Sequence, residues 1–173
     1  MCSKACCMGD YNRIEGIIHN GDLPQADRSV TSESTSVGQE VILVIDDDPD
    51  ILNSTRRLLS QEGWVVLTAS DPVEGLQFYE AHWREVQLVL LDYFLPRLRG
   101  DAVFERLQNI NPQVRVLLTT ACADDVSPKM LQGGLYGFVQ KPLSPRDLVA
   151  WIRRSLGHDA QAPQDLLDIG QVD

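Results

Sequence analysis

Aspartates directly follow two strongly apolar segments of this 173-residue chain. The segment VILVI (41–45) is followed by Asp46, Asp47 and Asp48. The segment VQLVLLD (86–92) ends in Asp92. Neighbouring carboxylates repel one another, and removing each from water costs several kcal/mol, roughly the effective penalty for a buried ion. The cluster is therefore either solvated surface or a site for a cation, and carboxylate oxygens favour Mg2+.

A hydroxyl group and an ammonium group follow two later apolar segments. VRVLLTT (114–120) ends in Thr120, and YGFVQ (136–140) is followed by Lys141. Beside a divalent cation, these groups would complete a site for phosphoryl transfer, in which positioning and charge neutralisation supply most of the catalysis. A carboxylate in line with phosphorus can itself be the nucleophile and form an acyl phosphate.

Alternating strand and helix patterns run from residue 41 to residue 156 and must position these groups. Apolar runs predict strands at 41–45, 64–69, 86–92, 114–120 and 136–140. Helical spacing predicts helices that begin at Pro49, Pro72, Gly100, Ser127 and Leu143. Such units predict an α/β fold, a doubly wound, five-stranded parallel sheet of the flavodoxin-like type with helices on both faces. Ligands of such sheets bind at the carboxyl ends of the strands, where the reactive groups stand.

Two details of the helices can be predicted from their residues. Asp48 precedes Pro49, a pair typical of an N-cap followed by the first helical residue. The helix after Pro72 is expected to bury a face formed by Val73, Leu76, Tyr79 and Trp83.

Charge and composition divide the chain into an N-terminal extension (1–40), a domain (41–156) and an acidic tail (157–173). The extension carries six acids and three bases, and the tail has four acids and no Lys or Arg. The Ser/Thr-rich stretch SVTSESTSVGQE (29–40) predicts a linker, so we expect the extension to be partly disordered. No second ligand pair at zinc spacing follows Cys2, Cys6 and Cys7, which favours a reduced segment over a metal site.

Patterns absent from the sequence also limit its function. There is no basic stripe, which argues against direct binding to DNA or RNA. No apolar run approaches the roughly 20 residues of a membrane span. The N-terminus lacks the basic-then-apolar pattern of a secretory signal. We therefore expect a cytoplasmic protein without a membrane span.

Four motifs together resemble a known family. They are VILVIDDDP (41–49), LVLLDYFLPRLRG (88–100), VLLTTA (116–121) and GFVQKP (137–142). Their order, intervals and positions at strand ends are similar to those of the receiver domain of two-component response regulators. The resemblance covers about residues 41–156 and implies the flavodoxin-like receiver fold.

The resemblance implies a metal site and a phosphoacceptor. Asp92 corresponds to the aspartate that accepts the phosphoryl group. Asp47 corresponds to a direct Mg2+ ligand, whereas Asp46 acts mainly through water. Phe94 would offer its backbone carbonyl to the metal.

The resemblance also implies the residues that respond to phosphorylation. Thr120 corresponds to the switch hydroxyl that meets the phosphoryl group, and Lys141 pairs with a phosphoryl oxygen. Pro142 follows Lys141 through a bond that is usually cis in the family. Phe138 corresponds to the switch aromatic, which turns inward when Thr120 moves.

Two positions depart from the family pattern, although Pro96 and Gly100 match its loop after the acceptor. The residues two after the acceptor and two after the switch threonine tune self-dephosphorylation in the family. Here they are Phe94 and Cys122, neither of which orients water well. We therefore hypothesise that the phosphate on Asp92 is long-lived.

The expected function is that of a stand-alone response regulator receiver. A histidine kinase or histidine phosphotransfer protein would phosphorylate Asp92 in a Mg2+-dependent reaction. The 17-residue tail is too short for a DNA-binding domain, so the signal would pass to an unknown downstream protein by direct contact. The chain would not be an enzyme beyond, at most, a slow autophosphatase activity.

Two other classes of function compete with this interpretation. Asp46-x-Asp48, Thr120 and Lys141 mimic a haloacid-dehalogenase-type phosphatase. Members of that family carry Thr or Val after the aspartate pair and a second acidic pair later in the chain, and this sequence has neither. A phosphatase of that type would also leave Asp92 without a role. A phosphorylation-independent scaffold is the other alternative, and the complete set of acids and lysine argues against it.

Overall fold

The computed structural model describes residues 39–158, which contain one parallel sheet of five strands. The strands are β1 (Val41–Ile45), β2 (Val65–Ala69), β3 (Val86–Asp92), β4 (Val116–Thr120) and β5 (Gly137–Gln140). Their order across the sheet is β2-β1-β3-β4-β5, with every pair parallel. This is the flavodoxin-like order, so the predicted doubly wound fold is confirmed.

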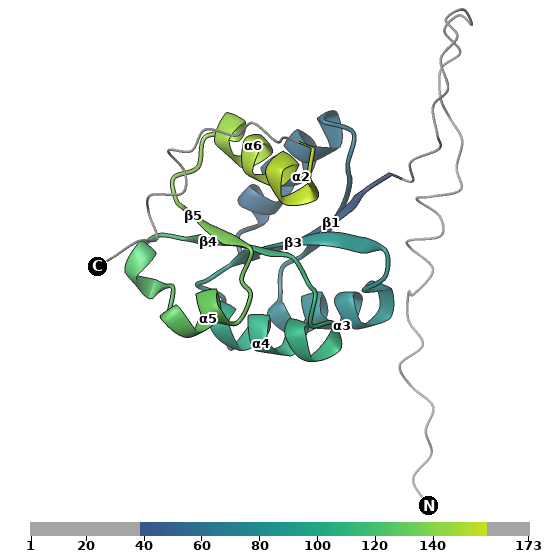
Figure 1. Ribbon diagram of the computed structural model, residues 1–173. Coiled ribbons are helices and arrows are strands. Elements are labelled where there is room, and N and C mark those ends of the chain that lie inside the picture. The colour runs from purple at the N-terminus through teal and green to yellow at the C-terminus, as the bar shows by residue number, and fades with distance from the viewer. Residues whose placement is uncertain (1–38, 159–173) are drawn as a thin grey trace, which may run out of the picture. The chain divides into compact units, whose positions relative to one another are not determined.

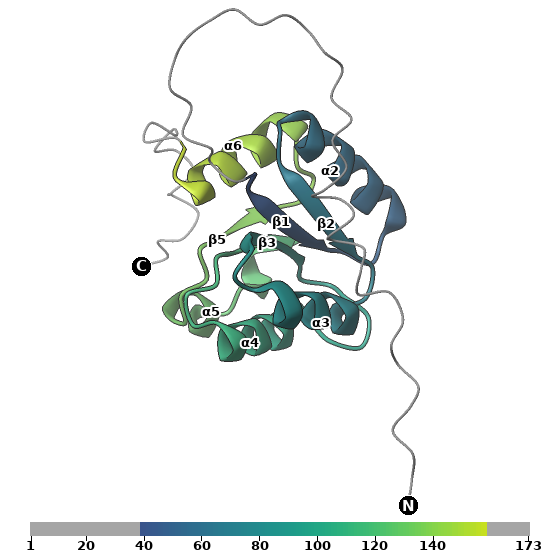
Figure 2. The same ribbon diagram turned by 90° about the vertical axis from the view of Figure 1, so that its right-hand side faces the viewer.

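Helices cover both faces of the sheet (Figures 1 and 2). They are α2 (Pro49–Gln61), α3 (Pro72–His82), α4 (Gly100–Ile110), α5 (Pro128–Gln132) and α6 (Pro145–Leu156). Figure 1 shows α2 and α6 on one face and α3, α4 and α5 on the other. None of these helices is long and apolar enough to cross a membrane.

Proline and a preceding polar residue fix the start of four helices. The capping side chains, each of which accepts backbone N–H groups of the first turn, belong to Asp48, Asp71, Ser127 and Ser144. Asp48 is therefore the N-cap that the sequence predicts, with Pro49 as the first helical residue. The last two helices begin one and two residues later than predicted, because Ser127 and Ser144 act as caps.

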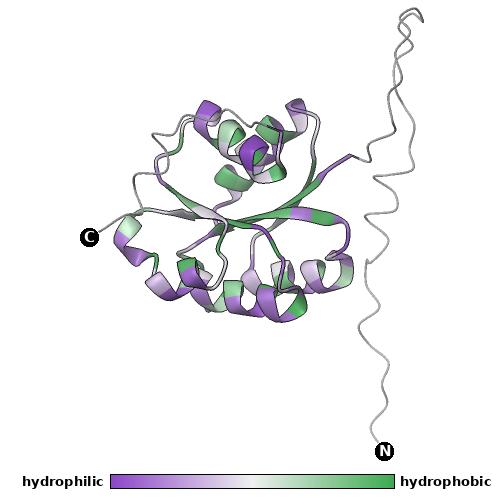
Figure 3. Ribbon diagram, in the orientation of Figure 1, coloured by the Kyte–Doolittle hydropathy of each residue, from purple (hydrophilic) through white to green (hydrophobic). Residues whose placement is uncertain are grey.

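The core lies between the sheet and its two helical layers. All five residues of β1 are buried, as expected for a strand covered on both faces. Alternate strand residues such as Ile42, Val44 and Leu90 form one cluster with Leu59 of α2 and Ile152 of α6. Figure 3 shows apolar residues along the strands and polar residues on the outer sides of the helices.

The prediction that Val73 is buried was wrong, because this side chain is 39% exposed. The buried face of α3 consists of Pro72, Gly75, Leu76 and Tyr79. Gly75 lies so close to Ile45 that an added Cβ would be 2.6 Å from the Ile45 Cδ1 atom. This close approach places Gly75 at the centre of the contact between α3 and β1, so Val73 lies at the edge of that contact.

No sequence pattern predicted the short 3-10 helix η2 (Ala123–Asp125) after β4. The remaining strand boundaries differ from prediction by one or two residues at the ends, which is normal fraying. Residues 1–38, which include Cys2, Cys6, Cys7 and most of the predicted linker, and residues 159–173 of the acidic tail lie outside the described residues.

We expect Gly100→Ala to destabilise the fold. A Cβ at Gly100 would lie 2.8 Å from the Tyr93 Cα atom and 3.2 Å from the Asp92 carbonyl oxygen. Backbone must then shift, at a cost of about 1–3 kcal/mol, typical of overpacking. Urea unfolding measures the change. Gly137→Ala is the matched control, because its Cβ would have its nearest contact, with Trp151, at an ordinary 3.4 Å. Equal losses in the two variants would contradict this explanation.

Candidate functional site

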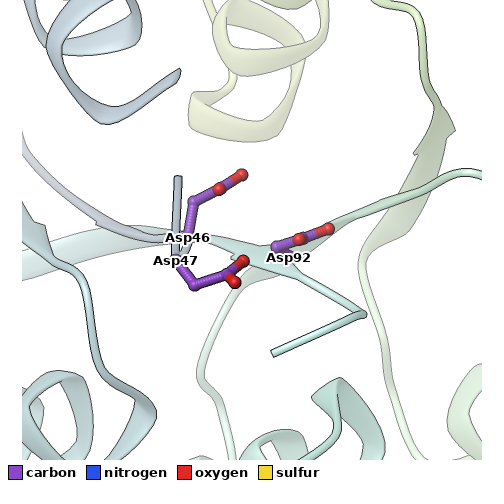
Figure 4. A group of neighbouring side chains, drawn as sticks. All are labelled: Asp46, Asp47 and Asp92. Carbon is purple, nitrogen blue, oxygen red and sulfur yellow. The ribbon is translucent and has the colours of Figure 1, made fainter. Parts of the chain in front are cut away.

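Three carboxylates meet at the carboxyl ends of β1 and β3. These strands are neighbours, with Ile45 paired with Leu91, so Asp46 and Asp47 follow β1 close to the end of β3 at Asp92. One oxygen from each carboxylate lies within 4.8 Å of the others (Figure 4). Asp46 and Asp92 are buried, at 3% and 6% exposure, whereas Asp47 is exposed. The structure thus brings together the acids that the strand-end argument selected.

Lys141 brings a positive charge to the same cluster. Its Nζ atom lies 3.0 Å from Asp46 Oδ2 and 3.0 Å from Asp92 Oδ1. β5 is separated from β3 by β4, so the side chain must reach past the end of β4 to make these contacts. The Lys141 backbone N–H donates to the Thr120 carbonyl at 2.7 Å, and the bond to Pro142 is cis, as the family resemblance implied.

Burial and pairing shift the protonation of two of these groups. Burial raises the pKa of the Asp46 carboxyl, although hydrogen bonds from the Asp48 backbone and from Lys141 partly oppose the shift. Burial of Lys141 favours its neutral form, but its hydrogen bonds to Asp92 and Asp46 outweigh burial and raise the pKa of the ammonium group. Lys141 therefore stays charged at neutral pH.

The donor set fits a hard divalent cation. With all groups ionised, Asp46, Asp47, Asp92 and Lys141 leave an excess of negative charge that a divalent cation would neutralise. All the available ligands are oxygens, as Mg2+ prefers. Asp46 already accepts from the Asp48 N–H at 3.0 Å through Oδ1 and from Lys141 through Oδ2. Both oxygens of Asp46 thus already have partners, whereas Asp47 and one oxygen of Asp92 are the candidates for direct contact with a cation.

Thr120 stands at the end of β4 and is fully buried. Its hydroxyl does not contact the carboxylate cluster among the hydrogen bonds of residues 39–158. Instead it lies 3.0 Å from the Cys122 carbonyl oxygen and 3.2 Å from Asp125 Oδ2, and it accepts from the Cys122 N–H at 3.2 Å. The predicted switch hydroxyl is therefore held by the loop that follows its own strand.

Phe138 and Phe94 stand at the predicted positions near this edge. Phe138, on β5, pairs with Leu118 and is half-buried. Phe94 is 48% exposed, and its ring meets the Tyr93 ring edge-on, with 5.1 Å between the centroids. Cys122 is a free, exposed thiol.

The sequence did not reveal two features of this region. One is Asp125, which contacts Thr120 only because η2 folds the chain back. The residues around Asp125 show no periodicity, so their sequence does not predict this contact. The other is a cavity of about 450 Å3 between α2 and α6, which reaches Asp46, Asp92 and Lys141. Its outer walls include Leu58, Leu143 and Leu148. Its existence depends on the spacing of two helices that are distant in sequence.

Residues 42–153 match the family described as the response regulator receiver domain. The matched range begins at the second residue of β1 and ends within α6.

Curated relatives share this part of the chain and are longer proteins. Hybrid signal transduction histidine kinase D of Dictyostelium discoideum is 34% identical over 69% of this chain and 8% of its own length. DNA-binding response regulator MtrA of Mycolicibacterium smegmatis is 33% identical over 76% of this chain and 57% of its own length. The chain thus spans about a tenth of the length of the first relative and just over half of the length of the second.

Solved structures show the same fold. A CheY-like response regulator receiver domain protein from Methanospirillum hungatei has 31% identity and a TM-score of 0.63, covering 69% of this chain and 94% of its own. A receiver domain protein from Clostridium thermocellum has 30% identity and a TM-score of 0.64, covering 68% of this chain and 94% of its own.

We expect Mg2+ to stabilise the protein through the carboxylate cluster. At a concentration ten times its dissociation constant, a ligand of the folded state adds about 1.4 kcal/mol. For a domain of this size that raises the melting temperature by on the order of 5 °C. Asp47→Asn should abolish most of this gain, because it removes the exposed ligand. Thermal unfolding with and without Mg2+ measures both effects.

Asp48→Asn is the matched control for this experiment. It removes the same charge one residue away, and Asn still caps α2. A full Mg2+ response in Asp47→Asn, or a lost response in Asp48→Asn, would show that the cation binds elsewhere.

Proposed function

The chain belongs to the response regulator receiver family, and from this premise we propose that Asp92 accepts a phosphoryl group from a histidine kinase or histidine phosphotransfer protein in a Mg2+-dependent reaction. The observation that carries the proposal is the position of Asp92. Its carboxylate shares one cluster with Asp46 and Asp47, and its Oδ1 atom lies 3.0 Å from the ammonium of Lys141.

The proposed reaction is a nucleophilic displacement at phosphorus. A carboxylate oxygen of Asp92 forms the O–P bond as the P–N bond of a phosphohistidine breaks, and the bonding electrons remain on the imidazole nitrogen of the donor. Bound Mg2+ would supply charge neutralisation on the phosphoryl oxygens. Burial of Asp92 keeps bulk water from its carboxylate, so fixed groups of the protein set its environment.

Lys141 has the geometry to follow the charge during the transfer. It bridges Asp46 and Asp92 before the reaction, at 3.0 Å from each. When one oxygen of Asp92 becomes the bridging oxygen of the acyl phosphate, the carboxylate loses its charge and the phosphoryl oxygens carry the negative charge. We infer that the ammonium group then pairs with a phosphoryl oxygen while it keeps its contact with Asp46.

The signal would leave the domain through a change of surface. In this proposal the Thr120 hydroxyl turns to the phosphoryl group and the half-buried ring of Phe138 moves inward. Phe94 would offer its backbone carbonyl to the Mg2+ ion. The receiver would act as an acceptor in the cytoplasm, with at most slow autophosphatase activity.

We propose output through protein contact rather than through direct contact with nucleic acid. Residues 41–156 carry 15 acids and 12 bases, and no basic stripe runs along them. The named relatives join receivers to a histidine kinase and to a DNA-binding regulator. The phosphatase alternative loses support, because the matched family is the receiver family and because Asp92 has no part in that mechanism.

Acetyl phosphate with Mg2+ should phosphorylate the wild-type chain on Asp92. Intact mass spectrometry should show the gain of one phosphoryl group, lost when Mg2+ is chelated. Asp92→Asn should show no gain, because an amide is not a nucleophile for this reaction. Asp50→Asn is the control, since it removes an exposed carboxylate from the same edge. Phosphorylation of Asp92→Asn at the wild-type level would refute the assignment.

The phosphorylated form should lose its phosphate slowly, over many minutes or longer. The exposed ring of Phe94 offers no hydrogen bond that could position an attacking water molecule. Phe94→Asn should shorten the half-life by about tenfold, the worth of one hydrogen bond of roughly 1.4 kcal/mol. Loss of the mass gain with time, after removal of acetyl phosphate, measures the half-life. A wild-type half-life of seconds with Mg2+ present would overturn the hypothesis.

A further inference from the structure

The Thr120 hydroxyl already has a charged partner in this structure. Its oxygen lies 3.2 Å from Oδ2 of Asp125, five residues along the chain. The hydroxyl also lies 3.0 Å from the Cys122 carbonyl oxygen. It has one hydrogen to donate, so these two acceptors compete for it. Hydrogen bonds to ionised acceptors are about twice as strong as neutral ones, which favours donation to Asp125.

Backbone hydrogen bonds hold the main chain at Thr120, so its side chain is the part that can respond at the least cost. The Thr120 carbonyl accepts from the Lys141 N–H at 2.7 Å, and Thr120 pairs with Gln140 in the sheet. Gln140 also holds the loop, because its side-chain amide donates to the Ala121 carbonyl at 3.2 Å. A threonine side chain has three staggered positions about χ1. Movement of the hydroxyl toward Asp92 therefore requires rotation out of its contact with Asp125.

We propose that Asp125 is a positioning residue that competes with the phosphorylated Asp92 for the Thr120 hydroxyl. The inference rests on the proposed function, because it assumes that Thr120 responds to a phosphoryl group. In the resting protein the carboxylate of Asp125 holds the hydroxyl in the loop. Phosphorylation must break this charge-assisted hydrogen bond, so Asp125 lowers the fraction of the protein in the switched state.

The different burial of the two groups allows Thr120 to exchange one partner for the other. Thr120 is fully buried, so its hydroxyl needs an acceptor in either position. Asp125 is half-buried, so water can take the place of the hydroxyl once Thr120 has turned. The free-energy cost of switching is therefore the loss of one partly hydrated hydrogen bond. A phosphoryl group with several charged acceptor oxygens can offset it.

The neighbouring Asp124 provides a matched control. It lies in the same 3-10 helix, carries the same charge and is exposed. Within residues 39–158 its side chain has no hydrogen bond to Thr120. A general effect of acidic charge near the site would thus appear in Asp124→Ala as well, whereas the proposed contact belongs to Asp125.

The test is a titration of the full chain with beryllofluoride, a phosphoryl mimic, in the presence of Mg2+. The amide resonances of β4 and β5 report the concentration at half-saturation. Asp125→Ala should lower this concentration about three- to tenfold, the net worth of an ordinary hydrogen bond, because the half-buried carboxylate is partly hydrated. Asp125→Asn, which keeps the shape but not the charge, should fall between it and the wild type. Asp124→Ala should stay within about twofold of the wild type, the scatter of a surface substitution.

The decisive comparison uses Thr120→Val, which removes the hydroxyl and keeps the shape of the side chain. In that background Asp125→Ala should leave the half-saturation concentration unchanged. A purely structural role for Asp125 would lower the melting temperature and would not tighten binding of the mimic. Because Asp125→Asn keeps the side-chain volume, it tests the same point if Asp125→Ala fails to fold.

Two results would overturn the inference while the proposed function stands. One is a wild type that binds beryllofluoride with the same midpoint as the Asp125 variants. The other is an Asp125→Ala effect that persists in the Thr120→Val background. A wild type that binds no beryllofluoride and gains no phosphoryl group overturns the proposed function, and the inference with it.

Discussion

The ammonium group of Lys141 lies 3.0 Å from both Asp46 and Asp92, and these two contacts hold together an otherwise repulsive cluster. The two carboxylates are nearly fully buried, so neither can rely on water to stabilise its charge. Burial still raises the pKa of Asp46 despite its contact with Lys141. One lysine does not neutralise three aspartates. The remaining negative charge makes this edge of the sheet a candidate site for a divalent cation.

The strand order explains why these residues meet. β1 and β3 are adjacent, so their terminal aspartates fall side by side without any long connection. β5 lies two strands away from β3, and Lys141 spans that distance with its long side chain. β4 lies between them, which places Thr120 where its backbone binds Lys141 and its side chain is enclosed. Asp92, Lys141 and Thr120 therefore form a continuous series of contacts from β3 to β4 and β5.

Residues whose behaviour follows from local chemistry were predictable from the sequence. Asp48 before Pro49 predicts a cap, and aspartates at the ends of apolar runs predict a shared edge. Val73 was assigned to the wrong face because the close approach of Gly75 to Ile45 depends on tertiary packing. The contact made by Asp125 was not predicted, because it too depends on how the chain folds in three dimensions. Its contact with Thr120 depends on a 3-10 turn of three residues, which is too short to show any periodicity.

The cost of the cluster bears on whether the domain could be only a scaffold. Replacing a buried ion pair with apolar residues of similar volume is often neutral or stabilising. A scaffold would thus lose nothing by replacing Asp46, Asp92 and Lys141 with apolar side chains, and this chain instead buries both acids. The nearby Thr120 hydroxyl contacts the Cys122 carbonyl and Asp125, which belong to the loop after β4, rather than the sheet. A buried charged cluster beside a hydroxyl that contacts two acceptors therefore supports the proposed switch over a static support.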